Sequence, residues 1–136
     1  MIIFFCFVGQ SKHIIKTRKM TKNGASRRDR STFANYTAAV STKLHLEWTL
    51  NFETRTISGY AIHTVKVLQQ GTSTVVFDSS KLHIVDVSID GNPVSFAVGE
   101  VSPALGSSVT VSIPEPLRKA GAQFDVVFEY STYPQA

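Results

Sequence analysis

The sequence is poor in the residues that build covalent or metal-bound frameworks. Its 136 residues include one cysteine, Cys6, and four histidines. A single cysteine excludes an internal disulfide framework and a cysteine-rich zinc site. This composition fits a reducing compartment, and a cytoplasmic protein is expected, although a disulfide-free secreted domain has the same composition.

The sequence also lacks a segment that could cross a bilayer. The apolar run "IIFFCFV" at residues 2–8 is far shorter than the roughly 20 residues that a spanning helix needs. No Lys or Arg precedes this run and no small-x-small site follows it, so it is a poor signal peptide. We expect residues 1–27 to form a disordered leader and residues 28–136 to form one domain. Met20 is an alternative start of the protein.

Basic residues are scarce outside the leader. Residues 1–30 carry eight Lys or Arg and one Asp, a net charge of +7, whereas residues 31–136 carry six against nine, a net charge of −3. Residues 31–136, the body of the chain, therefore lack the basic charge pattern of a nucleic-acid-binding protein. The stretches "KTRK" and "RRDR" within residues 1–30 remain a weaker alternative as a phosphate-binding patch.

What the body does contain is strand periodicity. Leu44, Leu46, Trp48, Leu50 and Phe52 alternate with polar residues, which indicates a strand with one buried face. A second strand follows at "ISGYAIHTVKVL". A two-residue turn at Thr54 and Arg55 predicts that Trp48 pairs with Ala61, Leu50 with Gly59 and Phe52 with Ile57. In that register Trp48 is a core residue, and Trp48→Ala should cost roughly 3–5 kcal/mol.

Further short strands follow at regular spacing. They are "STVVFD", "LHIVDVSI", "VSFAV", "SVTVSI" and "QFDVVFEY", with "DGNP" as a turn from which "VSFAV" leaves as a hairpin partner. The predicted buried faces include Val109, Val111 and Ile113, and then Phe124, Val126, Phe128 and Tyr130. About seven strands without a long helical pattern predict an all-β fold, an antiparallel sandwich or curved sheet.

Residues with catalytic or metal-binding spacing are absent from this pattern. His13, His45, His63 and His83 contain no pair spaced four residues apart, so no helix face offers two zinc ligands. His45, His63 and His83 lie in predicted strands, and we expect each of them to be a structural residue. A metal pair of His45 and His63 would require a register shifted by one residue from the predicted one.

Carboxylates and nucleophiles give no better site. We find no predicted convergence for Glu47, Asp78, Asp86, Asp90 or Glu129, and no Gly-x-Ser-x-Gly motif or phosphate loop. Asn35–Thr37 forms an "NYT" glycosylation sequon only in a secreted protein. We therefore predict no catalytic, cofactor-binding or metal-binding residue in this chain.

Three stretches together resemble a known family. "RDRSTFANYTAAVSTKLHLEWTLNFETRTISGYAIHTV", "VFDSSKLHIVDVSIDGNPVSF" and "LGSSVTVSIPEPLRKAGAQFDVVFEYSTYPQA" are similar to the start of leukotriene A4 hydrolase and related aminopeptidases, which are gluzincin zinc metallopeptidases. The most characteristic pieces lie at residues 28–36, 88–93 and 105–117. Arg30 replaces a usual proline, and Tyr133 replaces a serine.

The resemblance implies a saddle-shaped N-terminal β-domain that forms one wall of the substrate cleft. The zinc motif, the substrate-amine motif and the catalytic tyrosine of the family lie further along the chain than this sequence extends. The resemblance therefore implies a non-catalytic, incomplete N-terminal domain without a cofactor of its own, zinc being present only in the full-length enzyme. Its implied partner is the downstream catalytic domain, with peptides as substrates of the full-length enzyme. An alternative is a stand-alone β-sandwich that binds another protein.

Overall fold

The chain folds into two antiparallel β-sheets. In the computed structural model, residues 30–134 are described. The expected leader at residues 1–27, with Cys6, His13 and the alternative start Met20, lies outside this range, as do Gln135 and Ala136. Within the range, the only helical element is the single 3-10 turn η1 (Glu115–Leu117), so the prediction of an all-β fold is confirmed.

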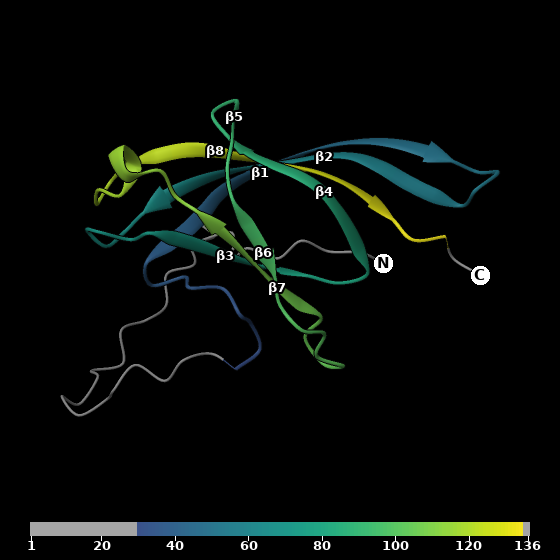
Figure 1. Ribbon diagram of the computed structural model, residues 1–136, viewed down its shortest axis with the longest axis horizontal. Coiled ribbons are helices and arrows are strands. Elements are labelled where there is room, and N and C mark those ends of the chain that lie inside the picture. The colour runs from purple at the N-terminus through teal and green to yellow at the C-terminus, as the bar shows by residue number, and fades with distance from the viewer. Residues whose placement is uncertain (1–29, 135–136) are drawn as a thin grey trace, which may run out of the picture.

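The larger sheet has five strands in the order β1-β2-β8-β4-β5. These strands are β1 (Ala39–Asn51), β2 (Thr56–Val67), β4 (Leu82–Ile89), β5 (Asn92–Pro93) and β8 (Gln123–Thr132). The smaller sheet has the order β3-β7-β6, with β3 (Thr74–Ser79), β6 (Phe96–Val98) and β7 (Ser107–Ser112). Figure 1 shows the smaller sheet packed below part of the larger one.

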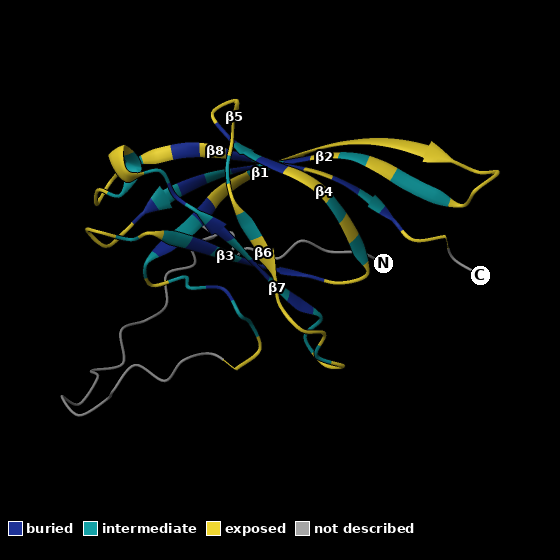
Figure 2. Cartoon of the chain, in the orientation of Figure 1, coloured by how far each residue is buried: buried dark blue, intermediate teal, exposed yellow. Residues whose placement is uncertain are grey.

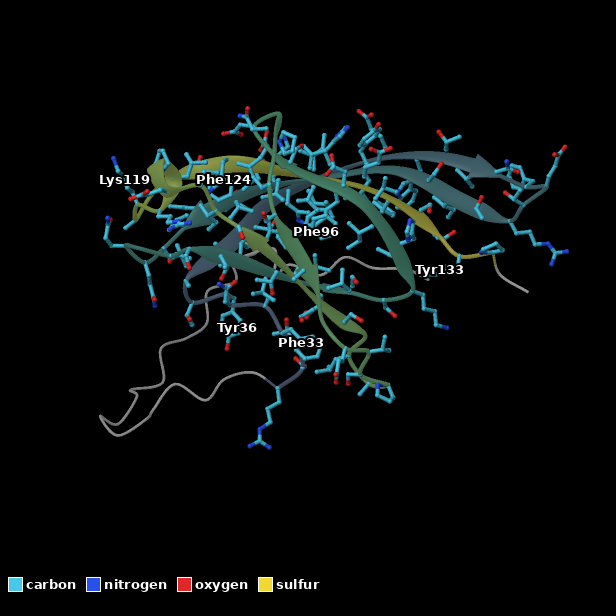
Figure 3. All side chains as sticks on the ribbon, viewed as in Figure 1. Phe33, Tyr36, Phe96, Lys119, Phe124 and Tyr133 are labelled. Carbon is cyan, nitrogen blue, oxygen red and sulfur yellow. The ribbon has the colours of Figure 1, made fainter. Side chains whose placement is uncertain are left out.

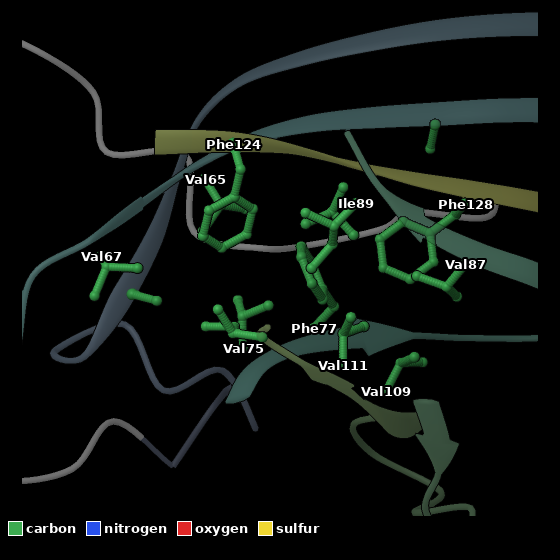
Figure 4. Close-up of a cluster of buried hydrophobic side chains, with 14 of the residues drawn as sticks. Val65, Val67, Val75, Phe77, Val87, Ile89, Val109, Val111, Phe124 and Phe128 are labelled. Carbon is green, nitrogen blue, oxygen red and sulfur yellow. The ribbon is translucent and has the colours of Figure 1, made fainter. Parts of the chain in front are cut away.

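The core lies between the two sheets and comes from the predicted alternation. Along β8, residues Phe124, Val126, Phe128 and Tyr130 are buried, while Asp125 and Glu129 between them are exposed. Figure 4 shows Phe124 and Phe128 of this row facing Val75, Phe77, Val109 and Val111 of the smaller sheet. The ring of Phe77 meets that of Phe128 edge-on at a centroid distance of 4.8 Å, a favourable aromatic geometry.

The predicted hairpin at "DGNP" is only partly correct. The turn is present, with Asp90 and Gly91 at positive φ, and β5 pairs Asn92 with Ile89 and Pro93 with Ser88. Pro93 is tolerated because β5 is the edge strand of its sheet. The amide of Val94 still donates to the carbonyl of Val87 of β4, at 3.1 Å. However, Phe96 then pairs with Val111 in the smaller sheet, so "VSFAV" continues the hairpin only at its first residue and then crosses to the other sheet. Figure 3 shows Phe96 between the layers.

The register of the β1–β2 hairpin differs from the prediction by two residues. Trp48 pairs with Gly59 and Leu50 with Ile57, because residues 52–55 form a four-residue connection in place of a two-residue turn. Gly59 has φ +153°, and a Cβ there would lie 1.9 Å from the carbonyl oxygen of Glu47. Only glycine therefore fits opposite the indole-bearing residue.

The chain before β1 forms a strap along the free side of β3. The amide of Phe33 donates to Asp78 Oδ1 at 2.7 Å, and the hydroxyl of Thr32 donates to the other carboxylate oxygen. The side chain of Asn35 donates to the carbonyl of Thr74 and accepts from the amide of Val76, each at 2.9 Å. Residues 31–38, which we call the edge strap, thus satisfy backbone groups of β3 that would otherwise be exposed.

Candidate functional site

The most distinctive surface is an apolar continuation of the core that no other described element covers. Directly paired residues lie on the same face of a sheet, so Trp48 and Gly59 share the core face with Tyr130 and Ile84. Figure 1 shows that the β1–β2 hairpin extends beyond the smaller sheet. The predicted buried face of β1 is therefore covered only near the beginning of the strand.

Exposure values define this surface. Leu46, Trp48 and Leu50 are 39%, 53% and 54% exposed, although they continue the face that holds the buried Ala61 and Phe128. Figure 2 shows the change from buried to exposed along the hairpin. We call the set of Leu46, Trp48, Leu50 and Ile57 the open face. The prediction that Trp48 is a core residue is wrong, because the second sheet ends before it reaches the indole.

One polar contact fixes the indole on the open face. Trp48 Nε1 donates a hydrogen bond to Tyr130 Oη at 2.6 Å, across the intervening strand β2. Burial raises the pKa of the Tyr130 phenol, and the hydrogen bond with Trp48 opposes this rise. This contact restrains the Trp48 side chain on the open face.

His63 is a buried core residue and lies away from any open surface. Its Nδ1 lies 3.0 Å from the hydroxyl of Ser41, and its ring packs 4.9 Å from Phe77 and 5.8 Å from Phe128. Burial lowers the pKa of His63 from 6.5 to about 4, so the imidazole is neutral at physiological pH. A Ser–His pair without solvent access cannot meet a substrate, and this pair is structural.

The other described histidines do not converge. His45 pairs with Ile62 and His63 with Leu44, so His45 and His63 lie on opposite faces of the sheet. His45 Nε2 contacts Glu47 Oε1 at 3.2 Å on the exposed surface. The ring of His83 lies 6.2 Å from that of Tyr133 near the end of β8. No group of three or more His, Cys, Asp or Glu residues within the described range is placed to hold a metal ion.

The carboxylates have structural positions, with one juxtaposition that the sequence analysis missed. Asp78 anchors the edge strap, and Asp90 accepts from the amide of Asp125 at 3.0 Å. Asp86 lies directly opposite Glu129 because the irregularity between Ile84 and Asp86 shifts the register of β4. No feature of the sequence predicts this bulge. The pair lies on the solvent face of the sheet, and no third ligand joins it within the described part of the chain.

The side chain of Asn35, the first residue of the sequon, is hydrogen-bonded within the fold. Asn35 Nδ2, the atom to which a glycan would be attached, donates to the carbonyl of Thr74 within the edge strap. A sugar at this atom would displace the strap from β3. Figure 3 shows Phe33 and Tyr36 of the same segment beside the smaller sheet. Within the described residues no helix is long and apolar enough to cross a membrane.

Comparison with known proteins gives a consistent class. No protein-family model matches the chain. Leucine aminopeptidase 2 from Candida glabrata is 29% identical over 104 residues, which are 76% of this chain and 16% of that protein. The yeast leukotriene A4 hydrolase structure with bestatin superposes with a TM-score of 0.71 at 23% identity, over 85% of this chain and 18% of that one. A mutant two-domain M1 zinc metallopeptidase bound to L-arginine superposes with a TM-score of 0.54 at 18% identity, over 72% and 21%.

These similarities show that the chain has the fold of a β-structured portion of the M1 zinc metallopeptidase structures. More specifically, it is homologous to the N-terminal portion of the leukotriene A4 hydrolase and leucine aminopeptidase 2 family, as the resemblance of the sequence indicated. The chain spans less than one fifth of the length of these relatives, for example 16% of the Candida glabrata protein.

Proposed function

We propose that the chain is the non-catalytic scaffold portion of a zinc aminopeptidase of this family and that its open face packs against the remainder of such an enzyme. In that arrangement the chain forms one wall of the substrate cleft, and the catalytic residues belong to the part of the enzyme that lies beyond this sequence. Its site of action is the cytoplasm.

The open face is the observation that carries this proposal. Soluble proteins rarely leave contiguous apolar side chains such as Leu46, Trp48 and Leu50 exposed on an ordered sheet without a partner. The face continues the core directly and is held in place by the Trp48–Tyr130 hydrogen bond. A further layer of protein would extend the same core, which is how layered β-domains grow.

The described residues do not fit a zinc site. His45 and His63 face opposite sides of the sheet, and the Asp86–Glu129 pair gains no third ligand among residues 30–134. We therefore assign the metal and the reaction to the remainder of the enzyme and derive no catalytic step for this chain. Its contribution is the shape and apolar surface of a supporting wall.

A chimera tests the proposal. The matching N-terminal segment of Candida glabrata leucine aminopeptidase 2 is replaced by residues 28–136, and hydrolysis of leucine anilide is measured. We expect a soluble chimera with kcat within about tenfold of the parent. An inactive but correctly folded, zinc-loaded chimera would contradict the scaffold assignment.

Two matched variants locate the packing surface within the chimera. Leu50→Lys places a charge on the open face, whereas Asn51→Lys places one on the opposite, solvent-facing side of the same strand. A buried unpaired charge costs several kcal/mol, so we expect Leu50→Lys to abolish soluble active enzyme and Asn51→Lys to leave it active. Equal behaviour of the two variants would show that the open face is not the packing surface.

A stand-alone interaction module is the second candidate, because an open apolar face also suits a separate protein partner. The two candidates differ in the chimera. A module with its own binding role gives no functional complementation of the aminopeptidase, even when it folds. The nucleic-acid alternative has no support from the described residues, since the body carries a net negative charge.

A further inference from the structure

Three of the four sheet edges in the described part of the chain are protected from pairing with another strand. The edge strap covers β3 through Asn35 and Asp78. β5 has two residues, one of which is Pro93, and pairs only with Ser88 and Ile89 of β4. The rest of that edge lies along β4 and is interrupted by the irregularity between Ile84 and Asp86. β6 has three residues. Short strands, proline and covering segments are the usual means by which proteins block edge-to-edge association.

The fourth edge, β1, has none of these protections. β1 is 13 residues long, contains no proline, and has β2 as its only neighbour among the described strands. Its residues 45–51 are all exposed. A long, regular edge strand with apolar side chains is a ready template for another strand.

The sequence of this exposed stretch is self-complementary about its centre. We infer that β1 pairs antiparallel with β1 of a second copy, with the two-fold axis at Trp48. Trp48 then opposes Trp48 of the second copy, Leu46 opposes Leu50, and Glu47 opposes Thr49. All apolar side chains then lie on one face, and no two like charges lie directly opposite each other. Both conditions favour an isologous interface.

Neighbouring registers are less favourable. A two-fold axis at Glu47 would place two carboxylates directly opposite each other, which is destabilising. An axis at Leu46 would draw in Lys43, which adjoins the irregularity between Ser41 and Lys43 and interrupts regular pairing. The centre of the exposed stretch at residues 45–51 is Trp48, so this register uses the whole free edge.

The inference does not rest on the proposed function, because it uses the backbone edge of β1 and the proposed function uses the open face. The two meet at Trp48, whose indole lies on the face and whose backbone lies on the edge. A second copy extends the larger sheet from five to ten strands and shields one side of each indole. Pairing with a second copy and packing in a larger enzyme are therefore separately testable.

Disulfide trapping in the full chain tests the register. In a Cys6→Ser background, Glu47→Cys and Thr49→Cys are prepared as separate proteins, and both positions lie on the exposed polar face. Directly opposed residues have Cα atoms about 4.5–5.5 Å apart, within disulfide reach, whereas diagonal neighbours lie about 7–8 Å apart. We expect mild oxidation to link the mixture of the two proteins and to leave each protein alone largely unlinked.

Sedimentation velocity supplies the second measurement. We expect a concentration-dependent dimer for the parent chain and a monomer for Leu50→Lys with an unchanged circular dichroism spectrum. A parent chain that stays monomeric at all concentrations would overturn the inference. This holds also if the fluorescence of Trp48 shows that another part of the same chain covers the indole. Efficient linking within either single-variant sample would overturn the register and with it the proposed two-fold axis.

Discussion

At the scale of single residues, His63 carries the clearest physical consequence of the fold. Its ring is enclosed by Phe77 and Phe128, and Ser41 is its polar neighbour. The interior therefore holds a titratable group in its neutral form. Protonation requires either unfolding or a charge in an aromatic core, and both are costly.

This burial predicts a pH-dependent stability. The folded pKa of about 4 lies below the unfolded value of 6.5, so between these values the unfolded chain binds a proton that the folded chain does not. The free energy of unfolding is therefore fully available above pH 6.5 and falls as the pH is lowered toward 4. Over the whole interval the shift corresponds to a loss of about 3 kcal/mol, of which roughly 2 kcal/mol falls between pH 7 and pH 4.5, where urea unfolding measures it.

A matched pair of variants identifies the group. His83→Gln replaces an exposed histidine of β4 and should keep the pH dependence. His63→Asn keeps a polar partner for Ser41 but has no titratable ring. It should reduce the dependence of the free energy of unfolding on pH between about 4 and 6.5, even if it lowers the stability at every pH. An unchanged slope in His63→Asn would contradict the assignment.

At the scale of secondary-structure elements, the β1–β2 hairpin depends on one glycine. Gly59 lies opposite Trp48 and combines a positive φ with a near contact to the backbone of Glu47. Because that contact is with backbone atoms, no side-chain rotation can relieve it. The hairpin must separate locally to accommodate a methyl group.

We therefore expect Gly59→Ala to lower the free energy of unfolding by at least about 3 kcal/mol, through overpacking and backbone strain together. Gly71→Ala is the control, because Gly71 also has positive φ, +80°, but nothing within 4 Å of the added Cβ. It should cost only about 1–2 kcal/mol. Chemical denaturation compares the two, and equal costs would show that the contact with Glu47 is not limiting.

The open face gives a second prediction at this scale. Trp48→Ala should cost about 1 kcal/mol in the free chain, because it removes the hydrogen bond to Tyr130 from a half-exposed side chain. Phe128→Ala, within the core, should cost about 3–5 kcal/mol. A similar large cost for both variants would mean that the indole is covered in solution.

The contrast between Trp48 and Phe128 shows how far the sequence could predict this fold. Alternation assigns both residues correctly to one face of a strand, and it gave the buried rows of β7 and β8. It cannot say where a second sheet ends, and that boundary decides which part of β1 is buried. The four-residue connection at 52–55 and the crossing of Phe96 into the smaller sheet likewise depend on contacts between distant strands.

At the scale of the whole molecule, an ordered β-scaffold is combined with an apolar surface that its own described strands leave uncovered. Homology relates the chain to the N-terminal portion of leukotriene A4 hydrolase and leucine aminopeptidase 2, of which it spans less than one fifth. The polar groups of Asn35, Asp78 and Tyr130 stabilise the fold, through the edge strap and the Trp48–Tyr130 contact. We propose that the chain supports catalysis by the remainder of such an enzyme and does not itself perform it.

Activity of the purified chain tests this claim most directly. The full 136-residue protein is incubated with amino-acyl anilides and stoichiometric zinc, with leucine aminopeptidase 2 as the positive control and a chelator-treated sample beside each. We expect no release of aniline above the buffer rate and no tightly held zinc after dialysis. Sustained turnover that disappears with the chelator and returns with zinc would contradict the account.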